Sequence, residues 1–419
     1  MDEQTDVAIV GASIAGCAAA RFLAQRGARV TLIEKRPDPE AYKVVCTHYI
    51  QPSAMSAIRR LGLDGPLEEA GAAPAKIDVW TRYGWACWQD DAYHGYNVRR
   101  SVLDPLLRRL TIETPGVTYL GGRTAVGLVE DGDRIRGVRV RATGGAEGTI
   151  AARLVVAADG RDSTVARMAR VPARKRPHGR FVYFAYFKDF ELTHGDRSQM
   201  WLLDPDLAYL FPSDDGTTCV AAFLSHAQRD AVRTDPDSHI RELYARLADA
   251  PNPWSGRRVS EWIGKLVLDN QRRPASARGM AFVGDAAQAS DPVAGVGCGF
   301  AFQSADWLAD EVSGALSEGD EALDRALRRY RAQHRRRLAG HHWVLSDFST
   351  GRKMRPAEKL VLSAAVRDEG FAARLEQFAS RDVTPARFVP GALARAGAVH
   401  LRHAVSARPD PTPPAQPGS

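Results

Sequence analysis

The sequence is poor in cysteine and has no long apolar run. It has five cysteines, at positions 17, 46, 87, 219 and 298. Their number is odd, and they show neither CxxC spacing nor a histidine at metal-ligand distance. They predict neither a disulfide framework nor a metal site. No apolar stretch reaches the roughly 18 residues of a membrane span, and no basic segment with an apolar core and cleavage site opens the chain. We therefore expect a cytoplasmic protein without a transmembrane segment.

The sequence also lacks a concentrated nucleic-acid footprint. The net charge is +7 and the isoelectric point is near 9.2, but the arginines are spread along the chain. The densest cluster, RRYRAQHRRR at 328–337, falls on a predicted helix, where it is typical of a solvated face. We expect no nucleic-acid partner. An acidic carrier protein or an anionic substrate is a second interpretation of the cluster.

The chain does have a βαβ pattern near its start. Short apolar runs at 7–10 and 30–33 predict strands buried on both faces, and the alanine-rich stretch between them predicts a helix. The turn GASIAG at 11–16 joins strand to helix, and Glu34 closes the second strand. Such a turn lets helix amides hold a pyrophosphate while the acid binds ribose hydroxyls. Ser13 replaces the middle glycine of the usual pattern.

Two further patterns follow along the chain. LVVAADGRDSTVARMA predicts a buried strand that ends at Asp159 and Gly160, with Ser163 or Thr164 capping the next helix. AFVGDAAQASDPVAGVGCGF at 281–300 predicts another buried strand, an aspartate and a second glycine-rich turn, before a helix from about 299 to 315. We expect the two glycine-rich turns to grip opposite ends of one long dinucleotide.

The middle and the end of the chain have other patterns. Residues 77–97 and 180–225 predict an antiparallel sheet able to roof a pocket, because apolar and polar side chains alternate there. The stretch 118–142 predicts a hairpin around Asp131 and Gly132. Amphipathic helices are expected to about 349 and weaker ones to about 403. The proline-rich end, 406–419, has no apolar face and predicts disorder.

Three motifs follow one another along the chain: the GASIAG turn with Glu34, the internal ADG, and the late GDAA followed by PxxGxGxG. Together and in this order they resemble the FAD-dependent monooxygenase superfamily of the para-hydroxybenzoate hydroxylase type. The wider group holds geranylgeranyl-reductase-like enzymes and flavin-dependent halogenases. The resemblance covers roughly residues 5–335. It implies an α/β fold with a Rossmann-like FAD-binding domain (1–76, 98–176 and 275–335), an inserted antiparallel-sheet substrate domain (77–97 and 177–274) and a helical C-terminal region (336–405).

The resemblance also implies roles toward FAD for individual positions. The first turn would surround the pyrophosphate, Glu34 would bind the adenosine ribose, and Val126 would offer backbone atoms near the adenine. Asp285 would bind the ribityl or pyrophosphate region, and backbone amides at 292–297 would face the isoalloxazine ring. The cofactor-binding candidates are Gly11, Ser13, Ile14, Ala15, Gly16, Glu34, Lys35, Arg100, Val126, Asp159, Asp285, Pro292, Gly295, Val296 and Gly297.

The loop VVCTHYIQPSAM departs from the family pattern. Cys46 is followed by Thr47 and His48, where the reductase branch has Cys, Gly, Glu and the halogenases have Gly, Glu, Ser. His48 is the catalytic candidate, as a partner of a substrate hydroxyl or as a proton relay, with simple packing beneath the cofactor as the alternative. Cys46 is interpreted as a buried small residue rather than a nucleophile. The substrate-contact candidates are Tyr49, Tyr83, Trp85, Tyr186 and Tyr209.

The resemblance implies an oxygen-dependent reaction. NAD(P)H would reduce FAD transiently without a second nucleotide fold, and O2 would then give a flavin hydroperoxide that hydroxylates or epoxidises an apolar or aromatic small molecule, in specialised metabolism. Alkene reduction of the geranylgeranyl-reductase-like type stays open, because RRSVLDPLL and the Cys46 loop are nearer to that branch. Halogenation is disfavoured because a WxWxIP stretch is missing. A non-catalytic flavin-binding docking protein is the remaining alternative.

Overall fold

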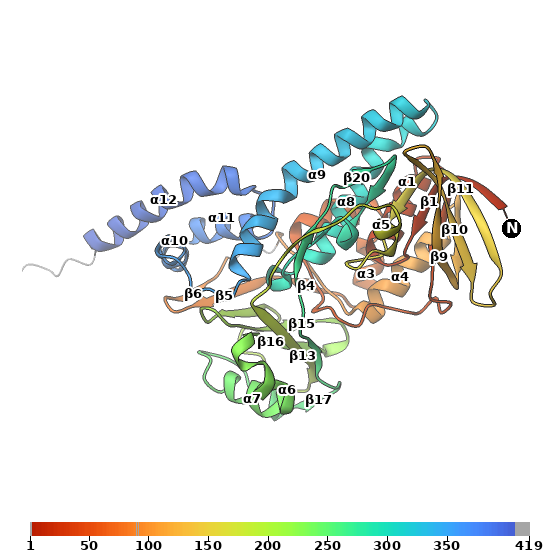
Figure 1. Cartoon of the computed structure of the whole chain (residues 1–419). Helices are drawn as coiled ribbons and strands as arrows, with labels where there is room; N and C mark the ends of the chain where they lie inside the picture. The colour runs from red at the N-terminus through yellow and green to blue at the C-terminus, as the bar shows by residue number, and fades with distance from the viewer. Residues whose placement is uncertain (1, 89, 91, 407–419) are drawn as a thin grey trace, which may run out of the picture.

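The computed structural model of the chain describes residues 2–88, 90 and 92–406. A sheet with its covering helices forms one side of the molecule, a second sheet lies below the centre, and a group of helices formed by the end of the chain extends to the other side (Figure 1). Among the helices of these residues, none combines the length and the apolar character that crossing a membrane would require.

The first sheet has a parallel centre. β1 (Asp2–Val10) lies between β11 (Glu147–Ala157) and β2 (Val30–Glu34), and the parallel order continues to β21 (Met280–Phe282) beyond β11 and to β8 (Val117–Gly121) beyond β2. The carboxyl ends of these strands meet at one edge, which is where open α/β sheets bind their ligands.

Helices cover this sheet and a hairpin extends it. The covering helices are α1 (Ile14–Ala24), α4 (Arg100–Ile112) and α8 (Val296–Val312), and α1 packs against both of the others. The hairpin consists of β9 (Arg123–Asp131) and β10 (Arg134–Ala142), and β10 pairs with β11; β20 (Ser276–Ala277) is the opposite edge. The predicted α/β class, βαβ unit and hairpin are confirmed.

The second sheet is mainly antiparallel, as predicted. Its order is β17 (Arg257–Arg258), β13 (Arg180–Lys188), β16 (Thr218–Ser225), β15 (Leu207–Pro212), β14 (Ser198–Leu202), β5 (Ile77–Thr81) and β6 (Gly84–Ala86), with β18 (Ile263–Lys265) also on β13. The pair β14 and β5 is parallel. That exception arises because β5 reaches the sheet from a distant part of the chain and not through a hairpin.

Side-chain alternation divides this second sheet into two faces. One face carries Phe181, Phe187 and Trp201 against α6 (Arg229–Thr234) and α7 (Pro236–Tyr244). The other face, here called the inner face, packs against Tyr49 and Val293 of the first region. The inner face is formed by Val182, Phe184, Tyr186, Met200, Leu207, Tyr209, Phe211, Cys219, Ala221 and Phe223.

Two small sheets connect the regions. One contains β3 (Tyr49–Ile50), β7 (Gly95–Asn97) and β4 (Ala73–Ala75), and the other contains β12 (Arg174–Arg176), β19 (Asn270–Arg272) and β22 (Gln288–Ala289). The short helices α2 (Met55–Arg60), α3 (Asp64–Glu69) and α5 (Thr164–Met168) complete the first region.

The end of the chain is helical, as predicted. It contains α9 (Asp320–Phe348), α10 (Pro356–Arg367), α11 (Glu369–Ala379) and α12 (Pro385–Ser406). The boundary expected between 335 and 336 falls inside α9, so the division into domains stays a prediction. The tail predicted from 406 includes the last residue of α12, and 407–419 lie outside the described residues.

Candidate cofactor and active site

The first glycine turn packs backbone against backbone. Gly11 has a φ of +105°, and a Cβ there would stand 2.5 Å from the carbonyl oxygen of Ala158 at the end of β11. A Cβ on Gly16 would stand 1.7 Å from the carbonyl oxygen of Gly11. The glycines at these two positions let α1 begin directly against the strand ends, so its first amides point at the sheet edge. Ile14 and Ala15 are buried in this first helical turn.

Polar groups of the first turn are already ordered. Glu34 accepts hydrogen bonds from the backbone amides of Ala12 (2.8 Å) and Arg36 (3.0 Å). Ser13 does not cap α1 with its side chain; its Oγ instead accepts a bond of 2.7 Å from Nη2 of Arg100. The serine that breaks the glycine pattern therefore joins α1 to the buried arginine of α4. Each carboxylate oxygen of Glu34 keeps a lone pair for a ribose hydroxyl.

The late motif converges on the first turn. Gly284 has a left-handed backbone, with a φ of +56°, and a Cβ there would stand 2.8 Å from Cβ of Ala15. The amide of the preceding residue, Val283, donates to the carbonyl oxygen of Ala157. Asp285 follows directly and accepts a 3.1 Å ion pair from Nζ of Lys43. Burial would raise the pKa of Asp285, but the charges of Lys43 and other cations more than offset it and lower the pKa. The two motifs thus meet in space.

The second glycine turn begins α8 and leaves open space beside it. Gly295 has a φ of +63°, and a Cβ there would stand 2.5 Å from the ring of Tyr49. α8 begins at Val296, three residues before the predicted start, because the left-handed Gly295 ends the preceding turn. A Cβ on Gly297 would meet no atom within 4 Å, and Gly297 is exposed. A flat ring can approach the bare backbone at Gly297, so this turn fits an isoalloxazine.

A buried ion cluster holds the second turn from behind. Oδ2 of Asp291 accepts hydrogen bonds from Nε2 of His178 (2.5 Å) and Nη2 of Arg180 (2.8 Å), while its Oδ1 accepts from the amide of Val293 (2.7 Å). Burial would raise the pKa of Asp291, but the positive charge of Arg180 and the bond from His178 lower it to about 2. Asp291 directly precedes Pro292, so this cluster positions the turn.

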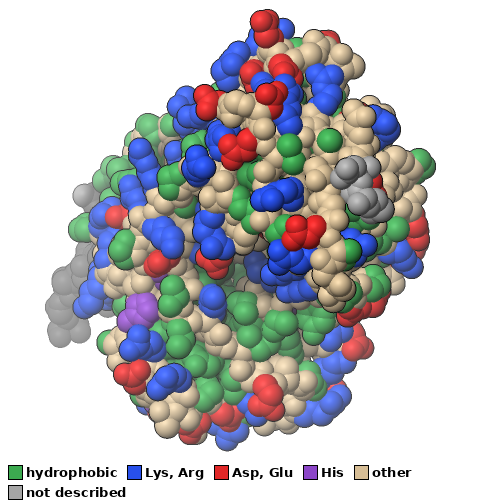
Figure 2. Space-filling model, turned by 45° about the vertical axis from the view of Figure 1, so that its right-hand side comes forward, with side chains coloured by type: hydrophobic (Ala, Val, Ile, Leu, Met, Phe, Trp, Pro, Cys, Tyr) green, Lys and Arg blue, Asp and Glu red, His purple; other side chains and the backbone are tan. Residues whose placement is uncertain are grey.

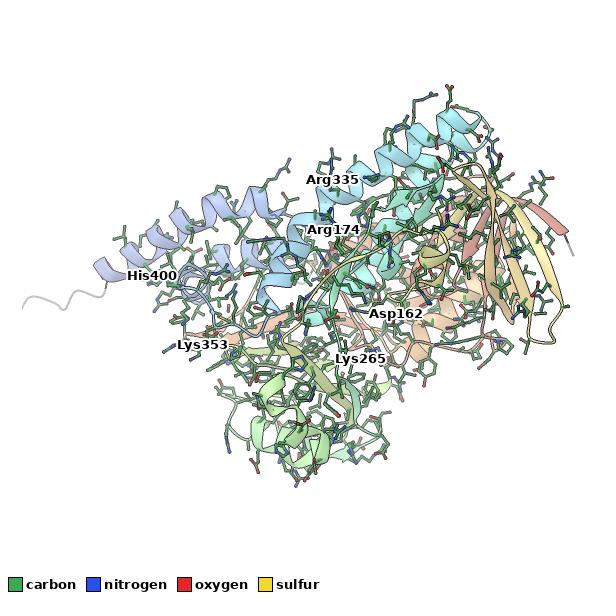
Figure 3. The ribbon with its side chains drawn as sticks, viewed as in Figure 1. Asp162, Arg174, Lys265, Arg335, Lys353 and His400 are labelled. Carbon is green, nitrogen blue, oxygen red and sulfur yellow. The ribbon has the colours of Figure 1, made fainter. Side chains whose placement is uncertain are left out.

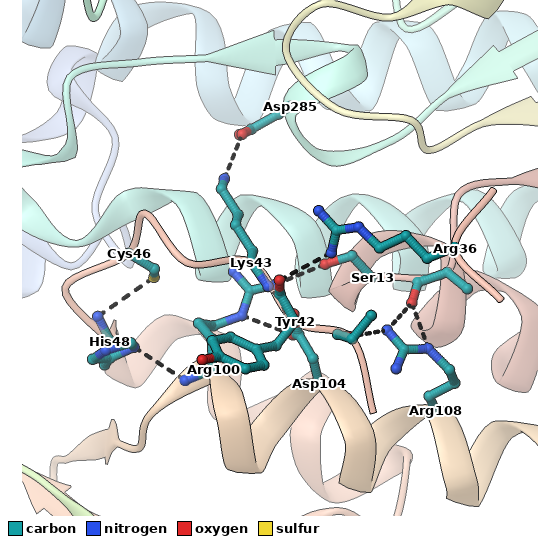
Figure 4. A network of polar contacts seen from close by, with 12 residues as sticks. Ser13, Arg36, Tyr42, Lys43, Cys46, His48, Arg100, Asp104, Arg108 and Asp285 are labelled. Carbon is teal, nitrogen blue, oxygen red and sulfur yellow. Dashed lines mark hydrogen bonds and ion pairs between the residues drawn. The ribbon is translucent and has the colours of Figure 1, made fainter. Parts of the chain in front are cut away.

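Sequence reasoning missed that cluster and further buried cations, among them Arg108. Arg108 donates to the carbonyl oxygens of Ala12, at 3.0 Å from Nη2, of Ala41, at 2.8 Å, and of Pro39. It thereby ties the 36–48 segment to α4 across the first turn (Figure 4). A signal for it exists in the sequence: Arg100, Asp104 and Arg108 recur every four residues, on one buried face of α4.

His48 is buried and contacts both sides of the site. Its Nδ1 accepts from the amide of Arg100 (3.2 Å), as Figure 4 shows, and its Nε2 lies in hydrogen-bonding contact with the hydroxyl of Tyr186 on the inner face. With Nδ1 accepting, the proton of a neutral ring sits on Nε2 and is donated to the Tyr186 oxygen. His48 has a φ of 72°, a left-handed conformation that costs a non-glycine residue about 1 kcal/mol or more.

The substrate candidates separate into two groups. Tyr49, Tyr186 and Tyr209 belong to the cluster of the inner face, where Tyr209 stacks on Phe211 with ring centroids 4.2 Å apart. Trp85 belongs to the opposite face, and its indole N–H donates to Asp249. Tyr83 lies in the turn between β5 and β6. The structure therefore brings the first three together and leaves Tyr83 and Trp85 away from them.

The other cofactor candidates occupy varied positions. Asp159 accepts hydrogen bonds from the hydroxyl of Ser163 (2.6 Å) and the amide of Val165 (3.0 Å), so it stabilises the start of α5. Val126 is half-buried in β9, and Lys35 is exposed after β2. Pro292 is half-buried, whereas Val296 is buried against Phe300 and Leu338.

A basic cavity lies beside α5. Its volume is about 600 Å³, and its lining includes Arg161, Arg167, Arg170, Lys175 and Arg273. This concentration of positive charge attracts anionic ligands such as phosphates.

A hollow opens on the face of the molecule in Figure 2. Basic side chains lie at its upper rim, and hydrophobic side chains line its lower wall.

Comparison with known proteins gives the family. Residues 4–343 match the FAD binding domain family, so the chain belongs to that family and is an FAD-dependent oxidoreductase. It is 28% identical over 369 residues to kynurenine 3-monooxygenase of Salinispora arenicola, covering 82% of this chain and 78% of the relative. It is 24% identical over 347 residues to digeranylgeranylglycerophospholipid reductase of Methanothrix thermoacetophila, covering 80% and 85%.

A solved structure supports the same fold. The myxobacterial chondrochloren halogenase CndH is similar with a TM-score of 0.72 and 21% identity, over 95% of this chain and 97% of that one. The matched proteins therefore span a monooxygenase, a reductase and a halogenase, and the expected superfamily is confirmed. The choice among these reactions has to come from the site.

Proposed function

We propose that the protein is an NAD(P)H-consuming, FAD-dependent monooxygenase that hydroxylates or epoxidises an apolar or aromatic small molecule. The observation that carries the proposal is the contact between His48 and Tyr186, beside the open backbone at Gly297 and the apolar inner face. FAD would supply the activation of O2. The chain supplies an apolar face and a positioned hydroxyl group.

The residues present allow a division of roles toward FAD. Glu34 and the amides that begin α1 would hold the adenosine and pyrophosphate, and Asp285 with Lys43 would lie along the middle of the cofactor. Backbone amides of 296 and 297 would face the ring, since that of Gly295 donates to the carbonyl oxygen of Pro292. Arg100 acts through Ser13, whose hydroxyl it orients at the pyrophosphate turn.

Tyr186 would donate its phenolic proton to the bound molecule. Burial raises the pKa of Tyr186, so its hydroxyl stays protonated at neutral pH. Because His48 donates Nε2–H to the hydroxyl oxygen, the phenolic proton is left to point away from His48 toward a bound molecule. His48 then stabilises negative charge on the oxygen that gives up this proton. In this proposal Tyr186 is the catalytic residue and His48 is a positioning residue.

A matched pair of variants tests these roles. Tyr186→Phe is expected to lower kcat about 100-fold, the low end for a lost acid or base, with FAD binding unchanged. Tyr183→Phe is the control, because Tyr183 lies on the same strand but packs with the opposite face. Equal kcat values for the two variants, measured as substrate-dependent NAD(P)H oxidation, would remove Tyr186 from the proposed mechanism.

The basic cavity supports a nicotinamide nucleotide as reductant. Its arginines and lysine would attract the phosphates of NAD(P)H. A second basic group, Arg174 on β12 beside Arg335 on α9 (Figure 3), supports the weaker proposal of an acidic carrier protein. Burial and the positive charges of Arg174, Arg335 and Arg176 lower the pKa of Arg272, so an acidic partner would relieve repulsion there.

Alkene reduction is the second candidate, favoured by one observation. The pKa of Cys46 lies well below its ordinary value, because of a hydrogen bond from Cys298 that, with His48 and Arg100, outweighs burial. A thiol with a lowered pKa at this place could give its proton to a reduced alkene. Halogenation and a purely docking role have no such observation.

The deciding experiment begins with the visible spectrum of the purified protein. A yellow holoprotein that consumes NAD(P)H under air, releases peroxide without substrate and transfers oxygen to one member of an aromatic and apolar panel supports the monooxygenase. Saturation of an alkene under anaerobic conditions, with no oxygen incorporated from any substrate in air, would assign the reductase instead. A colourless protein that refuses added FAD would contradict both enzymes.

A further inference from the structure

The surface of α12 that faces away from the other helices is apolar. Nine large hydrophobic side chains are exposed in the described part of the chain, and four of them lie on α12 or near the end of α9. These four are Trp343, Val389, Leu393 and Leu401. A second exposed row of α12, at helical spacing, consists of Ala386, Pro390, Ala394 and Ala398. The exposed residues of both rows on α12 are called its outer face.

The opposite face of α12 is packed against the molecule. Its buried residues, in one cluster with α10 and α11, are Phe388, Ala392, Ala396 and Val399. Arg395 and Arg402 form ion pairs with Asp368, between α10 and α11, at 3.7 and 2.9 Å. These contacts fix the rotation of α12, so its outer face points away from α10 and α11, toward the open side of α12 in Figure 1. The helix is therefore apolar on two sides, and only one of them is covered.

The charges near the outer face are positive. Residues 385–406 contain three arginines and no aspartate or glutamate, and Arg387 is exposed beside the outer face. α12 begins against α9, because a Cβ on Gly340 would stand 3.1 Å from Cγ of Pro385. Arg336 and Trp343 lie one turn before and after Gly340, and both are exposed. An apolar helix face bordered by arginines and an exposed indole is typical of a helix that lies on a membrane surface.

Two other ways to cover the outer face fit less well. Residues 407–419, which follow α12, contain no apolar side chain larger than proline, so they offer little to bury against leucines. A second copy of α12 would bring one set of arginines against another. The 22 residues of α12 form a rod about 33 Å long and about 10 Å wide, which gives about 330 Å² per partner. A stable interface buries about 800 Å² per partner.

We propose that the outer face of α12, together with Trp343, binds the surface of an anionic phospholipid bilayer. The helix lies in the plane of the surface, and Leu393 and Leu401 enter the boundary between headgroups and acyl chains. Arg336 and Arg387 remain at the level of the lipid phosphates, where their charges are neutralised. This binding goes beyond the proposed function and uses no flavin chemistry. Its failure and the failure of the monooxygenase are therefore distinguishable.

Flotation of the full chain with FAD bound tests the proposal. The protein is expected to rise with vesicles that contain phosphatidylglycerol and phosphatidylcholine. Binding to vesicles of phosphatidylcholine alone is expected to be at least about 10-fold weaker, because the arginines then meet no net negative charge. Protein that stays behind with both vesicle types overturns the proposal, and equal binding to both overturns the role of the anionic headgroups.

Four variants with matched exposure locate the binding face. Leu393→Glu and Leu401→Glu are each expected to lower partitioning into the mixed vesicles about 10-fold, because each places a charge where a leucine would be buried. Ile112→Glu, at the end of α4, and Val267→Glu, between β18 and β19, are the controls. Ile112 is 39% exposed against 41% for Leu393, and Val267 is 64% exposed against 70% for Leu401. Circular dichroism checks folding, and equal partitioning of all four folded variants overturns the proposal.

Two further measurements separate a bilayer from a protein partner. Mixed vesicles with brominated acyl chains are expected to quench a part of the tryptophan fluorescence that is missing in Trp343→Phe. Equal quenching of the parent and Trp343→Phe would place the binding face elsewhere. Light scattering without vesicles is expected to give the same mass for the parent and Leu393→Glu. A dimer that Leu393→Glu dissociates, with no flotation of the parent, would assign the outer face to a second copy of the chain and overturn the proposal.

Discussion

The two glycine turns are similar in sequence and differ in what requires their glycines. A Cβ on Gly11 or Gly16 of the first turn would stand 2.5 or 1.7 Å from a backbone oxygen, whereas a Cβ on Gly297 of the second turn has no neighbour within 4 Å. The fold itself demands the first two glycines. At Gly297 the fold demands nothing, and in the proposed function the flavin ring is the reason for leaving the backbone bare. If that proposal holds, glycine motifs mix positions required by packing with positions required by a ligand.

The largest effect is expected from Gly16→Ala. The added Cβ meets the carbonyl oxygen of Gly11, a backbone atom that cannot move aside without displacing the turn. We expect loss of soluble folded protein, measured by expression yield and circular dichroism. Gly65→Ala in α3 is the control, because a Cβ there meets nothing within 4 Å, and it is expected to be neutral or stabilising by up to about 1 kcal/mol. If the Gly16→Ala protein melted at the same temperature as the parent, backbone packing would not be the reason for the glycine in the first turn.

Asp291→Asn is expected to lower the free energy of unfolding by about 3–5 kcal/mol, because it leaves the buried charge of Arg180 without its carboxylate. Urea denaturation measures this value. Asp310→Asn is the control, since its ion pairs with Arg60 and Arg26 are partly exposed and are expected to contribute less than about 1 kcal/mol each. The result sharpens the comparison: the second turn is held by buried charge, and the first by backbone packing. Similar losses for both variants would contradict this difference.

Gly297→Val is expected to weaken FAD binding at least about 100-fold, or about 2.7 kcal/mol, while the protein stays folded. The valine side chain would occupy the open space that the flat ring needs. Titration of the apoprotein with FAD measures the affinity, and circular dichroism measures the fold. Gly65→Val controls for a branched side chain placed in a helix. Unchanged FAD affinity would show that the ring lies elsewhere and that both turns serve the fold alone.

The smallest effect is expected from pH. His342 of α9 hydrogen-bonds through Nδ1 with the hydroxyl of Ser290, next to the second turn, and burial lowers the pKa of His342 to about 4. A depressed histidine pKa gives stability that is full above about 6.5 and is lost as the pH falls toward 4. At pH 5 we expect a loss of about 2 kcal/mol relative to pH 7 from this group.

His342→Gln is expected to flatten that pH dependence between pH 7 and 5. Thermal melts at a series of pH values measure the slope for the parent and the variant. His239→Gln is the control, because His239 lies on α7 far from the turn, where its Nδ1 bonds with the backbone of Asp235 and its side chain is exposed. The same slope in His342→Gln and in the parent would show that acid does not act through the second turn.

Local patterns in the sequence were sufficient for the strands, the βαβ unit and both glycine turns. Hydrophobic periodicity and glycine spacing act over a few residues, and β2 lies where such a pattern places it, whereas α1 begins at Ile14, inside the turn expected at 11–16. The ion cluster at Asp291 was not predictable in this way, since His178 is 113 residues away and only the fold brings the two together. Long-range pairing of polar groups leaves no local signature.

The candidate site shows the same limit. Alternation in β13 and β15 puts Tyr186 and Tyr209 on one face of the second sheet, but the sequence does not say which face meets the first region. Trp85 was therefore grouped with them, although it packs on the opposite face. His48 was singled out because it departs from the family pattern of its loop, and its role toward FAD and substrate stays a prediction.

The unbroken length of α9 has a mechanical consequence. Its 29 residues form a rod of about 43 Å, and its Tyr330 hydroxyl donates to the Phe282 carbonyl oxygen while Phe348, at its end, lies beneath the Arg180 guanidinium. An unbroken helix that is fixed at Tyr330 and at its last residue has no hinge between these two points. A displacement of the Phe348 end would therefore be passed through Arg180 to Asp291, the residue that precedes the bend at 292–295.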